Sequence, residues 1–266
     1  MRHLSLKNRF FLILNIILLL CISNILCAGI KKDSITPLPT LNKKFLIVAH
    51  VALDGSGAMG ITEISIRNSI GNLNNYWNKI GVSFELCELK TIANYRYDTL
   101  ISQAREQELL ANFVIPDRIN IFYVDSIKDA AGKASLGGIT SSTNVGIWLE
   151  KGSTGAIIHE MGHFWGLKHT FDNDIPENPD HSNCATAGDG VCDTPVDPYI
   201  KSLDEEGYYL NYSCVFINKD KDANGNYFDP DAFNIMSYYS CGTCMKFTNG
   251  QYIKMVETYS AKKTKW

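Results

Sequence analysis

The fold of this chain is decided by the stretch His159-Glu160-Met161-Gly162-His163-Phe164-Trp165-Gly166-Leu167-Lys168-His169. His159 and His163 are four residues apart, so a helix places both imidazoles on one face, close enough to share a metal ion. Gly166 can end this helix in a left-handed conformation, and the turn then returns His169 as a third ligand. Three protein ligands leave a fourth position open for water, which is typical of a catalytic zinc site.

Glu160 lies between the two helical histidines without being obliged to bind the metal. This is where a general base for a zinc-bound water belongs. The alternative is a surface helix with two incidental histidines. A bare HExxH arises by chance in roughly one chain in a hundred of this length. The additional Gly166 and His169 make coincidence far rarer, so the pattern favours one zinc per chain.

The composition is that of an ordinary globular protein. The 266 residues are 45% hydrophobic and 20% charged, with a net charge of −3. This length suits one large domain or two lobes that share a cleft. The charge balance gives no basic excess, so we expect no nucleic-acid partner.

Residues 1–28 are predicted to be a secretory signal peptide, with a positive start, an apolar run and small residues near Cys27. The alternatives are a membrane anchor or a lipid-modified Cys27. Residues 29–43 read as a linker, which contains no cysteine and one carboxylate, Asp33. We therefore expect a secreted protein that has no contact with the membrane once the signal is removed and that is active without removal of a pro-segment.

Six of the eight cysteines lie after the predicted signal, and five of these follow the metal-binding helix. In a secreted chain this number implies disulfides, and six cysteines allow 15 pairings. We expect at least two disulfides after His169, with Cys184–Cys214 the first choice for one of them. A cysteine zinc site at Cys241 and Cys244 is the alternative, but no second pair stands at metal-site spacing.

Strands and helices alternate before the metal-binding helix. Apolar residues recur at helical spacing from Ile66 to Ile80, and Gly81 closes that helix. Ser153 or Thr154 could cap the metal-binding helix. We expect an α/β (α+β) fold with a mixed sheet lobe to about residue 166 and a smaller, loop-rich, disulfide-stapled lobe over 167–266. The other expected elements are strands over 45–53, 82–89, 118–124 and 145–149, an edge strand within 132–140, and helices over 98–113 and 249–259.

Several short motifs follow one another in an order that resembles a known family. They are HExxHxxGLxHTF at 159–171, GDxVxDTP at 188–195, NxMxY at 234–238, a cysteine at Cys244 and FTxGQ at 247–251. The first of them is the zinc signature of the metzincin metallopeptidases. Together they are similar to the pappalysin (cytophagalysin) branch of that group, over roughly residues 44–260. Cys192 and Cys241 are less familiar at their positions.

The resemblance implies a secreted zinc endopeptidase that acts on protein or peptide substrates. It implies that Met236 forms an apolar floor below the zinc and that Tyr238 is the phenol that stabilises the oxyanion. It further implies calcium near Asp189, Asp193 and Thr194, with a solvated acidic loop as the alternative. A non-catalytic secreted binding domain on the same scaffold is the alternative function, and a zinc hydrolase that acts on other substrates is a third.

Overall fold

The computed structural model describes residues 37–100, 102–139, 144–172, 174–178, 180–205, 207–239, 241–242 and 244–261. The predicted signal peptide, and residues 29–36 of the predicted linker, lie outside these residues. Residues 37–42 have no regular structure and lead into the first strand at Lys43. Within the described residues, no helix has both the length and the apolar character that a membrane span requires.

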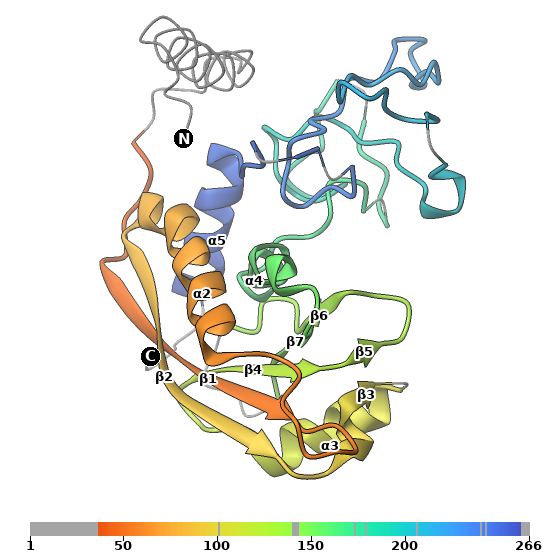
Figure 1. Cartoon of the computed structure of the whole chain (residues 1–266). Helices are drawn as coiled ribbons and strands as arrows, with labels where there is room; N and C mark the ends of the chain where they lie inside the picture. The colour runs from red at the N-terminus through yellow and green to blue at the C-terminus, as the bar shows by residue number, and fades with distance from the viewer. Residues whose placement is uncertain are drawn as a thin grey trace, which may run out of the picture. The chain divides into compact units, whose positions relative to one another are not determined.

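A five-stranded sheet lies at the centre of the described fold, with strand order β2-β1-β4-β7-β6 (Figure 1). Neighbouring strands are parallel from β2 to β7, and β6 runs antiparallel to β7 at the edge. A short parallel pair, β3 with β5, stands apart from this sheet. The strands are β1 (Lys43–Ala52), β2 (Val82–Ile92), β3 (Thr99–Leu100), β4 (Ile119–Val124), β5 (Ser126–Ile127), β6 (Gly132–Ala134) and β7 (Ile147–Glu150).

Helices cover both faces of the five-stranded sheet. Alternate residues of a strand point to opposite faces, so Tyr123 joins one core and Phe122 the other. The first core contains apolar side chains of α2 (Glu63–Trp77), α4 (Ile157–Phe164) and α5 (Asn249–Ala261). The second contains Leu109 and Leu110 of α3 (Gln103–Phe113). Burial on both faces explains the nearly continuous apolar sequence of the central strands.

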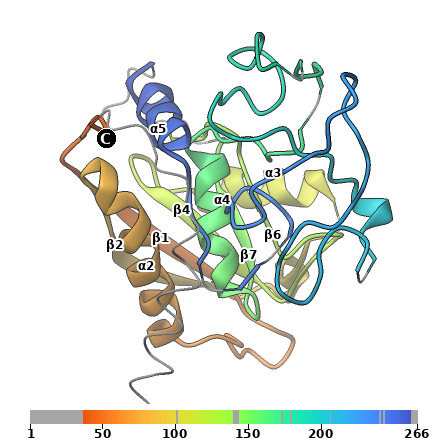
Figure 2. The same ribbon diagram turned by 90° about the horizontal axis from the view of Figure 1, so that it is seen from above.

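Helix α2 forms as its sequence predicts. The side chain of Thr62 accepts a hydrogen bond from the Ser65 amide and caps the first turn. After a single 3-10 turn, η1 (Asn78–Ile80), Gly81 adopts a φ of +65° and the chain enters β2. In the view from above, α4 lies beside α2 over the sheet (Figure 2). The residues expected to bind metal are therefore anchored between a packed helix and a packed sheet.

The helix expected over 98–113 begins only at Gln103. Tyr95–Asp98 form a 3-10 turn, η2, and the next two residues pair with β5. The carboxylate of Asp98 is buried and accepts hydrogen bonds from Lys151 Nζ at 2.5 Å and from the Asp125 amide at 2.9 Å. Because these partners lie far along the chain, local helical periodicity could not reveal this interruption.

The expected cap of the metal-binding helix is also wrong. A 3-10 turn, η3 (Thr154–Ala156), leads directly into α4, and neither Ser153 nor Thr154 makes a side-chain capping hydrogen bond. The amides are satisfied by the backbone instead, since Ala156 donates to the Ser153 carbonyl at 2.9 Å. The helix is entered through a tight turn rather than from an extended capping residue.

After His169 the described chain is mostly loops, apart from one 3-10 turn, η4 (Lys201–Leu203), and α5. The expected pair Cys184–Cys214 is wrong. The described residues form the disulfides Cys184–Cys192 and Cys214–Cys241, so the expectation of at least two disulfides after His169 is confirmed. Cys87 is a free thiol at an irregularity of β2, and its Sγ donates to the Ile47 carbonyl.

Candidate metal centre

Three imidazoles converge beside α4. His163 Nε2 lies 3.1 Å from His159 Nε2 and 3.1 Å from His169 Nε2. Potential ligand atoms of the three residues all lie within 4.8 Å of one another, and no other such group of three occurs in the described ranges of the chain. The spacing read from the sequence is therefore realised as a single triad.

The remaining ring nitrogens explain why the Nε2 atoms point inward. His159 Nδ1 donates to the Ile235 carbonyl at 2.7 Å, and His163 Nδ1 donates to the Leu167 carbonyl at 2.7 Å. Each hydrogen bond fixes a tautomer that leaves Nε2 with a free lone pair. Burial lowers the pKa of His159 to about 3 and that of His163 to about 4, so both rings are neutral ligands at neutral pH.

The third ring is held by a carboxylate. His169 Nδ1 lies 3.3 Å from Asp172 Oδ1, and the His169 amide donates to Asp172 Oδ2 at 3.0 Å. A carboxylate on the far nitrogen orients a ligating imidazole and raises its basicity. The sequence offered a signal for this partner, an acidic residue three positions after the third histidine, which the motif itself does not include.

The turn that returns His169 depends on Gly166. Its φ is +94°, and its amide donates to the His163 carbonyl at 2.8 Å. A Cβ at this position would lie 2.5 Å from Thr258 Oγ1 of α5. Both the backbone conformation and the close approach of α5 therefore require glycine here.

Glu160 is 6% exposed and lies against the edge strand β6. A Cβ on Gly132 would come within 2.7 Å of its Cγ, so β6 passes directly beside this side chain. Burial raises the pKa of Glu160 to about 8, and the nearby Lys133 cation opposes that shift. Glu160 thus lies beside the edge strand of the sheet and lines the same cleft as His159.

Met236 and Tyr238 also lie at the triad. Met236 is fully buried, and a Cβ on Gly162 would lie 2.5 Å from its Sδ, which places the thioether below α4. The ring centroid of Tyr238 is 4.8 Å from that of His169 and 5.7 Å from that of His159. Burial raises the pKa of the Tyr238 phenol, and the charges of Glu160 and Asp172 raise it further, so it stays a hydrogen-bond donor.

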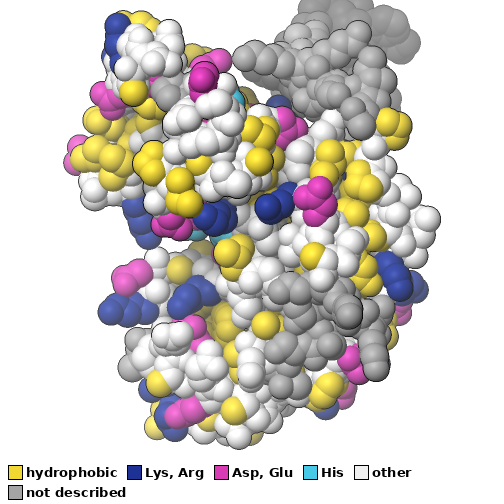
Figure 3. All heavy atoms as spheres, turned by 180° about the vertical axis from the view of Figure 1, so that it is seen from behind, with side chains coloured by type: hydrophobic (Ala, Val, Ile, Leu, Met, Phe, Trp, Pro, Cys, Tyr) yellow, Lys and Arg dark blue, Asp and Glu magenta, His cyan; other side chains and the backbone are white. Residues whose placement is uncertain are grey.

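The triad opens into a cleft of about 980 Å³. Its lining includes His159 and Glu160 on one side, Tyr238 on another and the chain just before and at Gly132. The space-filling view is hollowed between the loops that follow His169 and the sheet, with Lys and Arg side chains along both rims (Figure 3). A cleft of this size accommodates a segment of extended peptide.

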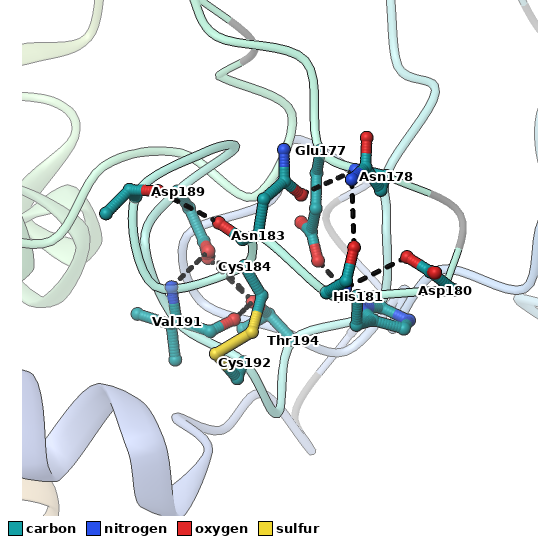
Figure 4. Close-up of a disulfide and its surroundings, with 12 residues drawn as sticks. Glu177, Asn178, Asp180, His181, Asn183, Cys184, Asp189, Val191, Cys192 and Thr194 are labelled. Atoms are coloured by element: carbon teal, nitrogen blue, oxygen red, sulfur yellow. Dashed lines mark hydrogen bonds and ion pairs between the residues drawn. A yellow bond between two sulfur atoms is a disulfide. The ribbon is translucent and has the colours of Figure 1, made fainter.

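The residues of the expected calcium site use their oxygens in hydrogen bonds. The Asp189 carboxylate accepts from the Val191 amide and lies 2.9 Å from the Thr194 hydroxyl (Figure 4). The Asp193 carboxylate accepts from Thr248 Oγ1 at 2.6 Å. Calcium at this place stays a prediction.

Comparisons with known proteins agree with this site. Residues 148–260 match the Peptidase_M43 family model, described as pregnancy-associated plasma protein-A. The chain is 26% identical over 243 residues to an extracellular metalloprotease of Arthroderma gypseum, covering 84% of this chain and 73% of that protein.

A solved structure shares the fold. Mature mirolysin of Tannerella forsythia, in complex with a cleaved peptide, matches with a TM-score of 0.57 and 17% identity. The match covers 82% of this chain and 91% of mirolysin. Sheet, helix and histidine triad together confirm the expected metzincin-like fold. Over residues 148–260 the chain is thus similar to the metalloproteases of the pappalysin family, Peptidase_M43, and this segment carries the metal site at His159, His163 and His169.

Proposed function

We propose that the metal is zinc and that the protein is an endopeptidase that cleaves peptide bonds in the cleft. The convergence of three imidazole Nε2 atoms beside a buried carboxyl group carries this proposal. Three neutral nitrogen ligands with an open position suit zinc, and the oxygen atoms beside every Nδ1 hold the three rings in place.

When bound, zinc supplies a Lewis acid that lowers the pKa of a water ligand and polarises a peptide carbonyl. Glu160 takes the proton of the attacking water and later passes it to the leaving amine. Tyr238 donates its hydroxyl proton as a hydrogen bond to the carbonyl oxygen as negative charge develops there. Met236 supports the triad from below.

The edge strand β6 supports an extended peptide as the substrate. β6 is the last strand of the sheet, so its outer edge has no neighbouring strand within the described sheet. An extended peptide can add to such an edge through main-chain hydrogen bonds. Because Gly132 of β6 contacts Glu160, a peptide in that register brings a backbone amide to the base. Mirolysin, which shares the fold, was solved with a cleaved peptide.

We also propose that the chain is secreted and that residues 1–28 are a signal peptide, which is removed. Residues 29–43 are then a linker, and residues 44–266 are the catalytic domain. The two disulfides and the extracellular relative support this reading. Calcium near Asp189 is supported by the burial that raises the pKa of this carboxyl to about 7, with Glu177 and Asp193 adding repulsion. A divalent cation would relieve that repulsion.

Cleavage of a mixed peptide library, with and without a zinc chelator, tests the function. We expect cleavage of internal peptide bonds that stops with the chelator and returns with added zinc. A zinc-loaded protein that binds peptides without cleaving them would instead indicate the non-catalytic binding domain. Hydrolysis of other bonds, without cleavage of peptide bonds, would indicate a zinc hydrolase that acts on other substrates.

A further inference from the structure

A side groove of about 370 Å³ leads away from the cleft along α2. The groove and the cleft share four lining residues, so the two spaces are contiguous; they are Asn72, Tyr76, Ile158 and Met245. Ile158 directly precedes the first metal-binding histidine in α4. A side chain of a bound substrate that enters the groove therefore lies close to the scissile bond.

Two lysines, Lys79 and Lys246, line the groove beyond these shared residues, and none of its described lining residues is acidic. Lys79 Nζ lies 5.3 Å from the ring centroid of the buried Tyr252. A cation over an aromatic face is held by the ring quadrupole, so this charge has a preferred place at the groove. In the described part of the chain no carboxylate pairs with Lys79.

Lys246 is positioned by the same turn that holds the metal site. Its carbonyl accepts a hydrogen bond from the Ile235 amide at 2.9 Å, and its amide donates to the Phe233 carbonyl at 2.8 Å. The Ile235 carbonyl in turn accepts from His159 Nδ1. The Lys246 backbone is thus two hydrogen bonds away from a metal ligand. Its ammonium lies 3.3 Å from Asp231, which offsets this charge in part.

We propose that this groove makes the protease selective for substrates that carry a carboxylate close to the scissile bond, with an acidic side chain as its occupant. The inference rests on the proposed endopeptidase function. The apolar walls formed by Tyr76, Ile158 and Met245 cover the methylene groups of the side chain, and Lys79 and Lys246 face its charge. A long acidic side chain such as glutamate fits this arrangement of apolar walls and a cationic end.

Paired peptides test the proposal on the zinc-loaded protein. Each pair differs by glutamate or glutamine at one position within four residues of the bond that is cut. We expect kcat/KM to be about fivefold higher for glutamate at one position, the size expected for a partly solvated ion pair. This ratio should fall as salt is raised. Peptides with free and amidated C-termini separate a side-chain carboxylate from a terminal one, and a preference for the terminal group alone would overturn the assigned occupant.

Variants locate the effect. Lys79→Gln should bring the glutamate-to-glutamine ratio of kcat/KM close to one, and Lys79→Glu should bring it below one. Lys90→Gln is the matched control, because Lys90 pairs with Glu88 on β2 and lines neither the cleft nor the groove. Equal zinc content and unfolding midpoints show that the variants are folded. Peptide cleavage with a ratio of one in the wild type, or a ratio that Lys79→Glu leaves unchanged, overturns this proposal alone. Loss of all cleavage in zinc-loaded wild type overturns the endopeptidase function itself.

Discussion

The imidazole Nδ1 of His159 lies 2.7 Å from the carbonyl oxygen of Ile235, 76 residues further along the chain. Ile235 directly precedes Met236, whose amide donates to Asn234 Oδ1 and whose carbonyl accepts from the Thr170 amide. A turn near the end of the chain therefore orients a ligand on α4. The histidine motif at 159–171 and the NxMxY motif at 234–238 are therefore joined by hydrogen bonds in the structure.

Asp172→Asn should weaken metal binding. The carboxylate holds the His169 ring through Nδ1, and loss of such a partner reduces metal affinity about 10–100-fold. Competition with a chromogenic chelator measures the dissociation constant directly. Asp174→Asn is the matched control, because Asp174 is exposed and pairs only loosely with Lys168 at 3.6 Å. Equal affinities for the wild type and Asp172→Asn would show that the carboxylate does not support the metal.

Gly166→Ala should destabilise the fold by about 2–4 kcal/mol. A φ of +94° strains any residue with a Cβ, and this Cβ would collide with Thr258 of α5. Urea unfolding measures the loss. The double variant with Thr258→Ala should recover the part of the unfolding free energy that is lost through the collision. It should not recover the part that is lost through the strained backbone at residue 166. Gly152→Ala is the control, since nothing lies within 4 Å of its Cβ position, and an equal loss there would refute the explanation.

Asp189→Asn should remove a pH dependence of stability. The pKa of buried Asp189 is about 7, above its usual value near 4, so between these values the folded state holds a proton that the unfolded chain releases. This group's stabilisation is complete below pH 4 and lost as pH rises to 7, on the order of 2–4 kcal/mol.

The measurement is thermal unfolding in calcium-free buffer between pH 5 and 8. The wild type should lose stability with rising pH relative to Asp189→Asn, whose side chain stays neutral. Added calcium should restore the wild type at pH 8 more than the variant if a cation binds there. Identical pH profiles for the two proteins would contradict the assignment of the raised pKa to Asp189.

Local sequence patterns predicted most of the strands and helices that precede His169. The apolar positions of α2 and the Gly81 stop lie within one segment, and the structure follows them. The histidine triad was predictable for the same reason, because the helical spacing and Gly166 fix it locally. The start of α3 at Gln103 was not, since it depends on the pairing of Asp98 with Lys151 across the fold.

The disulfides show a second limit. Cysteine spacing gives the number of possible pairs but not which loops meet. The Cys214–Cys241 bond lies within a cluster that also contains Tyr199, Tyr209 and Tyr239, far apart in sequence. Asp172 escaped prediction for a different reason, because an acidic residue near a histidine is common and only the 3.3 Å approach to Nδ1 gives it a role.

The zinc content and peptidase activity of Glu160→Gln test the central claim most directly. Glutamine keeps the shape of the side chain but cannot take a proton from water. The variant should retain one zinc per chain, because Glu160 is not one of the three converging ligands. Its kcat should fall about 10²–10⁴-fold, the usual contribution of a general base. A zinc-loaded Glu160→Gln protein that cleaves peptides at the wild-type rate would contradict the mechanism.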